Sequence, residues 1–336
     1  MNPYVLNEIS RVVEKLEDTN KFKNKSFFIT GATGFIGSYL VYVLEELNHR
    51  FNLNIEIYAL VRNIEKAKSF GFKNTTFIEG SIENKIDTTK EFDYIIHTAS
   101  PTDSKYFITN PVEVINNTIR GINNTVALAT KKTLGYLFTS SLEVYGICNE
   151  DRFIKENEYF PIDPNNVRNS YSEGKKLLEC LLSSYASEYQ IPVRIVRLGQ
   201  TFGPGISKND NRVFAEFARK VTNKEDIILK TKGETKRSYC SILDAILGIF
   251  IALFNGENGN SYNLASDDSY YSIYELAEKF IKNTESKIQI IEENDNKYLS
   301  TIKFGLDTSK LKAIGYKSYD NLDSMVLKLK DYFKTI

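Results

Sequence analysis

The sequence lacks the features that mark several classes of protein. Its 43 basic and 43 acidic residues leave no net charge, so the bulk charge points to neither nucleic acid nor a membrane surface as a partner. The longest apolar run, residues 245–254, is half of a membrane span, and we expect a buried helix there. The first 25 residues are charged and amphipathic, unlike a signal peptide. We therefore expect a cytoplasmic protein.

Cysteine and histidine are scarce. Cys148, Cys180 and Cys240 are widely spaced and form neither a metal-binding nor a redox motif. We expect free thiols, as in a reducing compartment. The two histidines, His49 and His97, are too few for a histidine-rich metal site, and we expect no bound metal.

Strand-like and helix-like segments alternate from residue 25 to 198. That alternation is typical of an α/β protein with a doubly wound parallel sheet, the Rossmann fold. Hydrophobic residues make up 42% of the chain, enough for a substantial core. We expect helices over 34–50, 110–132 and 170–189, and strands over 24–30, 55–63, 75–81, 92–100, 134–146 and 192–204.

The chain divides into three predicted parts. Residues 1–24 carry an amphipathic helix over 4–18, which we expect to cover the core or a subunit contact. Residues 25–198 are predicted to form the Rossmann domain, a fold whose usual ligand is a dinucleotide. After about residue 200 the pattern loosens into short elements and polar loops, so 199–336 is predicted as a smaller α/β substrate lobe, interleaved with the first and facing it across a cleft.

A glycine-rich turn, "FFITGATGFIG", lies between the first strand and the helix that follows. Glycines let the backbone turn sharply and let a pyrophosphate approach the helix N-terminus, whose N–H groups favour negative charge. Strand and helix flank the turn as this use demands. The predicted dinucleotide contacts here are Gly31, Thr33, Gly34, Phe35, Ile36 and Gly37.

A second motif, Y-x-x-x-K, is formed by Tyr171 and Lys175, which share one face of a predicted helix. With the G-x-x-G-x-x-G spacing and Ser141 on a strand between them, it resembles the short-chain dehydrogenase/reductase superfamily. The "GATGFIG" form, the length and the large C-terminal lobe are similar to the extended branch, the NAD-dependent epimerase/dehydratase family of nucleotide-sugar enzymes. The resemblance runs from about residue 25 to near the end of the chain.

The resemblance implies three catalytic roles. Tyr171 would be the general acid/base, although a free phenol titrates near pH ~10. Lys175 would favour its phenolate together with the positive nicotinamide ring, and would also hydrogen-bond the nicotinamide ribose. Ser141 would bridge Tyr171 and the reacting oxygen of the substrate.

The stretch "TSSLEVYG" decides between reactions. In family members that remove water from a hexose, an Asp-Glu pair follows the serine; here those positions are Leu142 and Glu143. Leucine cannot donate a proton, so a 4,6-dehydratase is disfavoured. The segments "SLEVYG", "TFGP" and "NDNRVF" look most like UDP-glucuronate decarboxylases and their relatives. Glu143 would act on substrate hydroxyls; the alternative is a structural carboxylate that caps backbone or pairs with an arginine.

The choice of cofactor depends on the end of the second strand. An NAD enzyme usually carries an acid there, whereas this chain has Arg62, with Lys66 and Lys68 nearby. The aspartate that the family usually places near the adenine is Ser81 here. We therefore favour NADP(H), with NAD(H) and a solvated basic turn as the alternative. The remaining expected cofactor contacts are Ile82, Ala99 and Ser100.

The substrate lobe carries motifs that resemble the family's nucleotide-sugar contacts. "RLGQTFGPG" places Gln200 where relatives have an asparagine near the pyrophosphate, and "NDNRVF" places Arg212 and Val213 near the nucleotide. In "KGETKRSYCSILDA", Arg237 would clamp the diphosphate, since a guanidinium forks onto phosphate oxygens. Asp244 is expected to cap a helix.

One further departure lies in the helix expected below the active site. Thr118 stands where relatives usually have asparagine, and the neighbouring Asn117 is expected to point elsewhere. Proton relay through that helix is therefore not expected to follow the family pattern.

Three functions remain as hypotheses. The first is an NADPH-dependent reductase of a keto group in a nucleotide-linked sugar, one candidate being a CDP-linked ketose reduced to a sugar alcohol for surface polysaccharide. The second is an NAD-retaining nucleotide-sugar 4-epimerase or UDP-glucuronate-type decarboxylase. The third is a non-catalytic NADP-sensing regulator, against which the intact Ser141, Tyr171 and Lys175 argue. By analogy, the helices at 111–132 and 170–188 would pair in a homodimer.

Overall fold

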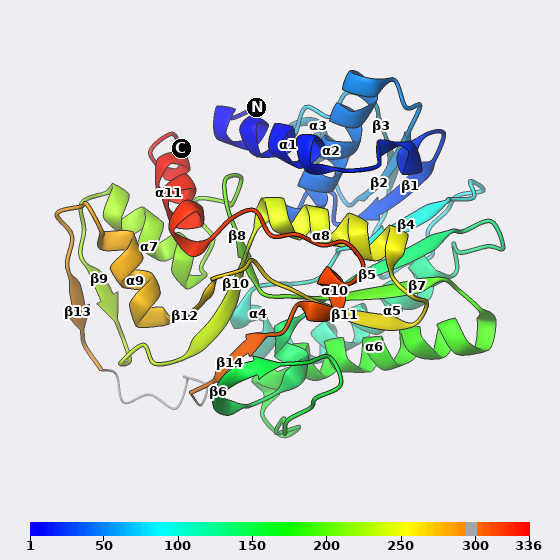
Figure 1. The fold of residues 1–336 in the computed structure, drawn as a ribbon. Helices are drawn as coiled ribbons and strands as arrows, with labels where there is room; N and C mark the ends of the chain where they lie inside the picture. Colours follow the sequence, from blue (N-terminus) through cyan, green and yellow to red (C-terminus); the bar gives the residue numbers. More distant parts are fainter. Residues whose placement is uncertain (293–300) are drawn as a thin grey trace.

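The computed structural model describes residues 1–292 and 301–336. Its centre is a parallel sheet of seven strands in the order β11-β7-β5-β4-β1-β2-β3 (Figure 1). Because β1 lies between β2 and β4, the winding of the chain reverses there, and ligands of such sheets bind at the carboxyl ends beside that point. The predicted Rossmann fold is confirmed. The strands are β1 Ser26–Thr30, β2 Glu56–Val61, β3 Thr75–Glu79, β4 Tyr94–His97, β5 Gly135–Ser141, β7 Val193–Leu198 and β11 Asn260–Leu264.

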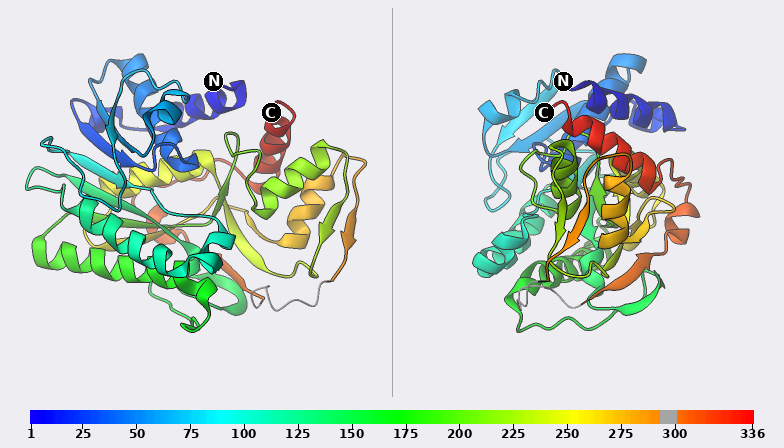
Figure 2. Two further views of the ribbon diagram at one scale, coloured as in Figure 1. Left: turned by 180° about the vertical axis from the view of Figure 1, so that it is seen from behind. Right: turned by 90° about the vertical axis from the view of Figure 1, so that its left-hand side faces the viewer.

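Helices cover both faces of the sheet, each over its own hydrophobic core. One face carries α1 (Pro3–Lys15), α2 (Phe35–Phe51) and α8 (Ile242–Asn255). The other carries α5 (Pro111–Val126) and α6 (Ser170–Tyr189), which lie side by side (Figure 2). The predicted buried helix over 245–254 is confirmed, because α8 is apolar on nearly every side and buried along most of its length.

The N-terminal helix α1 is fixed by a buried face and by charges. Val5, Ile9, Val12 and Val13 pack toward α2 and α8. On the same helix Glu8 is almost fully buried and joins an ion network with Arg11, Asp320 and Lys328. These ion pairs hold the N-terminal helix against the C-terminal part of the chain.

The second lobe contains a five-stranded sheet with the path β12-β10-β14-β6, onto which β8 pairs through β10, and a separate β13-β9 pair. Strand β6 comes from before residue 198, whereas β11 and α8 come from after it, so the two parts interleave; the division at 198 stays a prediction. The remaining strands are β6 Asn149–Ile154, β8 Gln200–Phe202, β9 Ile227–Leu229, β10 Lys236–Ser241, β12 Tyr270–Ser272, β13 Ile288–Ile290 and β14 Lys303–Leu306. The remaining helices are α3 Ile64–Lys68, α4 Ser104–Thr109, α7 Val213–Thr222, α9 Ile273–Ile281, α10 Ser309–Lys312 and α11 Leu322–Phe333.

Two of the predicted strands are not continuous. The strand over 134–146 stops at Ser141, and Leu142–Tyr145 forms a 3₁₀ turn in which the Ser141 hydroxyl accepts from the N–H of Glu143 at 3.2 Å. The strand over 192–204 divides into β7 and β8 at Gly199, where a Cβ would lie 2.8 Å from the carbonyl oxygen of Ser238. Both breaks lie at the carboxyl edge of the large sheet, where the functional side chains gather.

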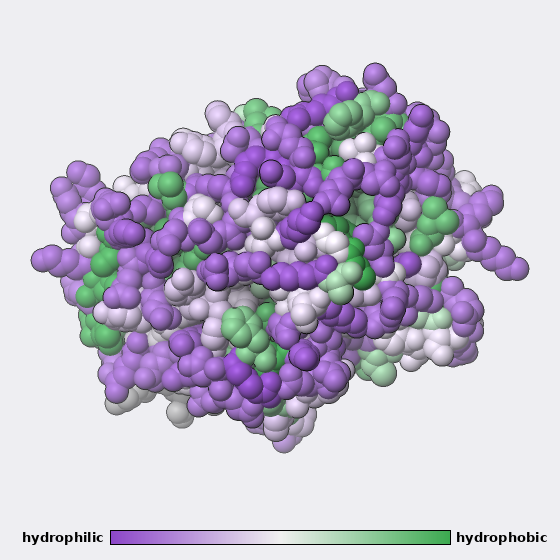
Figure 3. All heavy atoms as spheres, in the orientation of Figure 1, coloured by the Kyte–Doolittle hydropathy of each residue, from purple (hydrophilic) through white to green (hydrophobic). Residues whose placement is uncertain are grey.

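The surface in Figure 3 is mainly hydrophilic, and one of its hydrophobic patches lies at the left edge, over β9 and β13. Ile228, Ile290 and Ile291 are exposed there. All three cysteines are free thiols. Within residues 1–292 and 301–336 no group of His, Cys, Asp and Glu is arranged to hold a metal ion. Among the helices of that same part, none is long and apolar enough to cross a bilayer.

Candidate active site

The glycine turn between β1 and α2 adopts the geometry that a pyrophosphate needs. Gly31 has φ +72°, and a Cβ on Gly37 would lie 2.1 Å from the carbonyl oxygen of Gly31. Gly34 stands at the N-cap of α2 without any side-chain cap, which leaves the first N–H groups of the helix available to an anion.

The turn opens into a cavity of about 580 Å³ that runs along the carboxyl edge of the sheet. Arg62 and Lys66 line one end, and His97, Phe138 and Lys175 the other. Every predicted cofactor contact except Tyr171 lies on its walls: Gly31, Thr33, Gly34, Phe35, Ile36, Gly37, Arg62, Ser81, Ile82, Ala99, Ser100 and Lys175. An elongated cavity from the glycine turn to the lysine suits a dinucleotide.

Lys175 is buried at the inner end of this cavity. Its Nζ donates to the carbonyl oxygen of Thr139 at 2.8 Å and lies 4.5 Å from the ring centre of Phe138. Burial lowers the pKa of Lys175 to about 7, against the carboxylate of Glu179, which raises it. The lysine can therefore change its charge near neutral pH.

Tyr171 lies beside Lys175, whose Nζ is 5.8 Å from the centre of the phenol ring. Burial raises the pKa of Tyr171 above its ordinary value, and the charge of Glu143 raises it further. The Ser141 hydroxyl, as a hydrogen-bond partner, and the charges of Arg168 and Arg212 lower it. The Ser141 hydroxyl therefore acts on Tyr171, and the protein alone favours the protonated phenol.

Glu143 forms an ion pair with an arginine. The sequence analysis gave this as the alternative to a role on substrate hydroxyls. Arg168 donates to both carboxylate oxygens, Nη1 to Oε2 at 3.2 Å and Nη2 to Oε1 at 3.3 Å, and the Ser172 hydroxyl donates to Oε2 at 3.1 Å. Burial raises the pKa of Glu143, but Arg168 and Arg237 outweigh it and hold the pKa below its usual value. Glu143 is therefore a charged acceptor and not a proton donor.

Arg168 and Phe107 were missed in the sequence. The ring of Phe107 stacks on Tyr171, with centres 4.4 Å apart and planes at 11°, and the guanidinium of Arg168 lies 5.0 Å from the centre of the Phe107 ring. Arg168 stands three residues before Tyr171, just ahead of α6, and that spacing was the available signal. Phe107 comes from α4, a short helix that the sequence analysis did not predict.

The predicted substrate residues divide between two cavities. Arg237 and Glu143 line a small chamber of about 30 Å³ whose other walls are mostly apolar, including Leu142. Arg212 lines the large cavity instead and pairs with Asp210 at 2.7 Å.

Three of the predicted substrate residues line neither cavity. Ser141 ends β5. Val213 begins α7 directly after Arg212. Gln200 pairs with Tyr239 in the register of β8 and β10; Thr201, its neighbour, is the β8 residue that reaches the large cavity.

Comparison with known proteins decides the family. A model of the NAD dependent epimerase/dehydratase family matches residues 27–265. The chain belongs to this family. It is 29% identical over 274 residues to UDP-glucuronic acid decarboxylase 5 of Arabidopsis thaliana, covering 80% of this chain and 78% of the relative. UDP-glucuronic acid decarboxylase 2 of the same plant is 28% identical, and the match covers 97% of this chain and 72% of that relative.

Solved structures agree on the fold of this epimerase/dehydratase family member. The UDP-glucuronic acid 4-epimerase of Bacillus cereus, in complex with UDP-glucuronic acid and NAD, matches with a TM-score of 0.75 and 19% identity, over 92% of this chain and 99% of that one. The resemblance drawn from the motifs is confirmed, as is the expectation of a nicotinamide-dependent enzyme. The preference for NADP(H) receives no support, because this neighbour holds NAD.

Two expectations for this family member are wrong in detail. Asn117 lines the large cavity together with Thr118, so it does not point elsewhere. Asp244 is not the cap of α8, since the Ser241 hydroxyl accepts from the N–H of Asp244 in that role. The carboxylate of Asp244 instead accepts from the hydroxyls of Ser266 and Ser318 at 2.6 and 2.8 Å, which makes it a buried link between loops.

Proposed function

We propose that the protein acts on a UDP-linked sugar, in the first place a UDP-uronic acid, by internal redox: the C4 hydroxyl would be oxidised and the carbonyl reduced again, with no net consumption of the nicotinamide cofactor. Epimerisation at C4 and decarboxylation at C5 are the two outcomes of that chemistry. The observation that carries the proposal is the position of Tyr171. On one side it neighbours Lys175, which lines the large cavity, and on the other side it neighbours the ion pair between Glu143 and Arg168. The relatives named above support this reading better than a net reductase.

The residues of the chain would move protons and hold charge. Tyr171 takes the proton of the C4 hydroxyl, with Ser141 orienting both oxygens, and later returns it. A bound nicotinamide dinucleotide supplies the acceptor and donor of hydride and a positive ring that favours the phenolate. The ammonium of Lys175 acts in the same direction.

The charges around the small chamber favour an anionic sugar. Two guanidinium groups, those of Arg168 and Arg237, act on one carboxylate, that of Glu143, so the cluster retains one unbalanced positive charge. A uronic acid would bring a carboxylate to that charge. Oxidation at C4 turns such a sugar into a β-keto acid, which loses CO₂ without a proton donor at Leu142.

The net reductase remains a second candidate because of Arg62. Arg62 and Lys66 line the cavity end where an adenosine ribose would lie, and β2 ends in Val61 without an acid. A basic end suits the 2′-phosphate of NADP(H), and NADPH is consumed by reductases. From the residues of this chain we therefore propose NADP(H) as the cofactor, whereas the comparisons favour NAD(H).

A paired assay separates the two. The purified protein is denatured to release and identify any bound nucleotide, and is then mixed with UDP-glucuronate, UDP-glucose or CDP-linked ketoses, with and without NADPH. A C4 epimer or CO₂ without net change in nicotinamide absorbance supports internal redox. Stoichiometric loss of NADPH absorbance supports the reductase and overturns the proposal.

We also propose a homodimer through α5 and α6. The outward face of α6 carries Leu177, which is 48% exposed, and α5 carries Val112, which is 62% exposed. Light scattering on the purified protein tests this, and a monomer at micromolar concentration contradicts it.

A further inference from the structure

A buried ion pair lies directly behind the candidate active site. Arg197 of β7 binds Glu179 of α6 through Nε, at 3.1 Å to each carboxylate oxygen, and through Nη2 at 2.7 Å to Oε2. The two side chains are 4% and 8% exposed. A forked pair of this burial is costly to break from one side, because the remaining charge stays largely desolvated and loses its partner.

Glu179 also contacts the strand that carries the catalytic serine. The Ser140 hydroxyl donates to its Oε1 at 2.5 Å, and Ser141 is the next residue. Arg197 in turn donates to the carbonyl oxygen of Glu156 at 2.8 Å. One carboxylate thus joins the ends of β5 and β7 to α6.

Glu179 stands four residues after Lys175, on the same face of α6. The titratable groups that face Lys175 are Tyr171 on α6, His97 on β4 and Glu179. His97 is uncharged at neutral pH, because burial and then the charge of Lys175 lower its pKa to about 3. The carboxylate of Glu179 is therefore the negative charge that acts on the ammonium of Lys175.

We propose that Glu179, with Arg197 as its counter-charge, is a positioning residue of the active site whose carboxylate keeps Lys175 charged and fixes the strand end at Ser141. This rests on the acid/base roles of Tyr171 and Lys175 in the proposed function. Without that carboxylate, Lys175 loses its proton at a lower pH, and the phenolate of Tyr171 loses its stabilising neighbour. Activity should then decline from the alkaline side.

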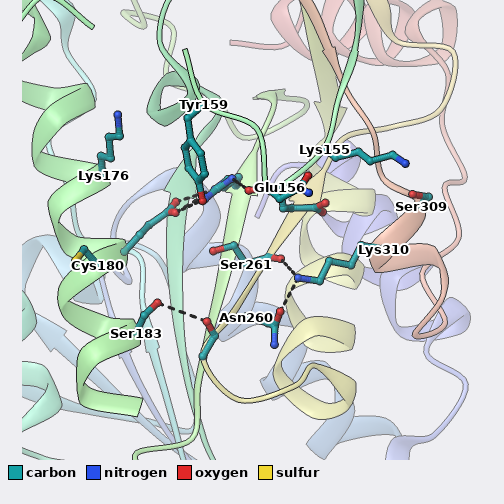
Figure 4. Close-up of a pocket in the computed structure, with 14 residues that line it drawn as sticks. Lys155, Glu156, Tyr159, Lys176, Cys180, Ser183, Asn260, Ser261, Ser309 and Lys310 are labelled. Atoms are coloured by element: carbon teal, nitrogen blue, oxygen red, sulfur yellow. Dashed lines mark hydrogen bonds and ion pairs between the residues drawn. The ribbon is translucent and has the colours of Figure 1, made fainter. Parts of the chain in front are cut away.

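An open pocket adjoins this pair. Its volume is about 670 Å³, and both Glu179 and Arg197 lie on its walls. Figure 4 shows Tyr159 over the pocket, Lys176 projecting from α6 at one side, and Lys310 directed at Asn260 and Ser261 opposite. Small carboxylates such as formate can therefore reach the position of the Glu179 side chain.

The first test is the pH profile of Glu179→Gln, with Glu188→Gln on the exposed end of α6 as the matched control. We expect the alkaline limb of kcat/KM to move down by about one pH unit or more in Glu179→Gln and to stay in place in the control. Because Gln would leave Arg197 unpaired, the double variant Glu179→Gln/Arg197→Met is measured too. It should restore thermal stability and keep the shifted limb. A folded variant with the wild-type limb overturns the proposal.

The second test is chemical rescue of Glu179→Ala by formate and acetate. Rescue should raise kcat/KM at least tenfold and return the alkaline limb, with chloride at equal ionic strength as control. Rescue of melting temperature alone indicates a structural role and refutes the positioning role. The pH dependence of NAD(P)H binding, followed by its fluorescence, is recorded for every variant. If the pH dependence of binding shifts but no UDP-sugar is turned over, the proposed substrate is wrong and the proposed role of Glu179 is supported.

Discussion

The close approach inside the glycine turn gives the sharpest prediction. In Gly37→Ala the new Cβ would lie 2.1 Å from the oxygen and 2.6 Å from the carbon of the Gly31 carbonyl. Non-bonded carbon and oxygen need roughly 3.2 Å, so the turn and the helix start must separate by roughly 1 Å. N–H···O bonds to a pyrophosphate work only within ~2.7–3.2 Å. A displacement of this size should weaken cofactor binding about 100-fold.

The assay is a titration of NADH and NADPH fluorescence, with a thermal melt to confirm the fold. Gly174→Ala is the control, because its Cβ would meet only Thr118 at 3.8 Å. That change lies inside α6 and should stabilise the protein by up to ~1 kcal/mol while leaving affinity unchanged. If Gly37→Ala binds the cofactor as the wild type does, the turn is not the pyrophosphate site.

Four further predictions concern charge and protons. Tyr171→Phe should abolish turnover and spare cofactor binding; persistent turnover would show that another group moves the proton. Arg62→Ala should weaken NADP⁺ binding at least tenfold more than NAD⁺ binding, and equal losses would assign NAD. Burial raises the pKa of Asp320, but hydrogen bonds from Arg11 and Lys328 outweigh it and hold the pKa below its usual value. Asp320 thus adds stability above its unfolded pKa of about 3.9, and that stability is lost as the pH falls through the lower folded value. Melting temperature should therefore fall more steeply below pH ~4 in the wild type than in Asp320→Asn. Arg11→Met should cost about 3 kcal/mol at pH 7, because it removes one partner of a buried carboxylate; an unchanged urea midpoint would contradict this.

The parts of the site that sequence reasoning found are those encoded by local constraint. A turn that admits only glycine, and a tyrosine and lysine four apart on one helix, are visible in a single segment. The alternation of elements likewise gave the sheet and the helices on its two faces. These features can be predicted without knowing which distant segments contact one another.

The parts that were missed depend on contacts between distant segments. Phe107 reaches Tyr171 from a helix 64 residues earlier in the chain, and its own segment does not indicate that contact. The pairing of β6 with β14 and of β11 with β7 crosses the predicted boundary at 198. Glu143 could be assigned to its ion pair only once the 3₁₀ turn after Ser141 was known, because a continuing strand would have aimed it differently.

The proton chemistry of the site bears on the choice among reactions. Elimination of water from a sugar needs an acid for the leaving hydroxyl and a base for the carbon proton. Leu142 cannot serve as the acid, and Glu143 is held charged by Arg168 and Arg237, so neither position supplies a proton. Tyr171, the group that we propose to accept and return a proton, lies next to Lys175, whose pKa burial lowers to about 7. A site with one such group matches a reaction that oxidises and then reduces the same carbon, and it does not match a dehydration.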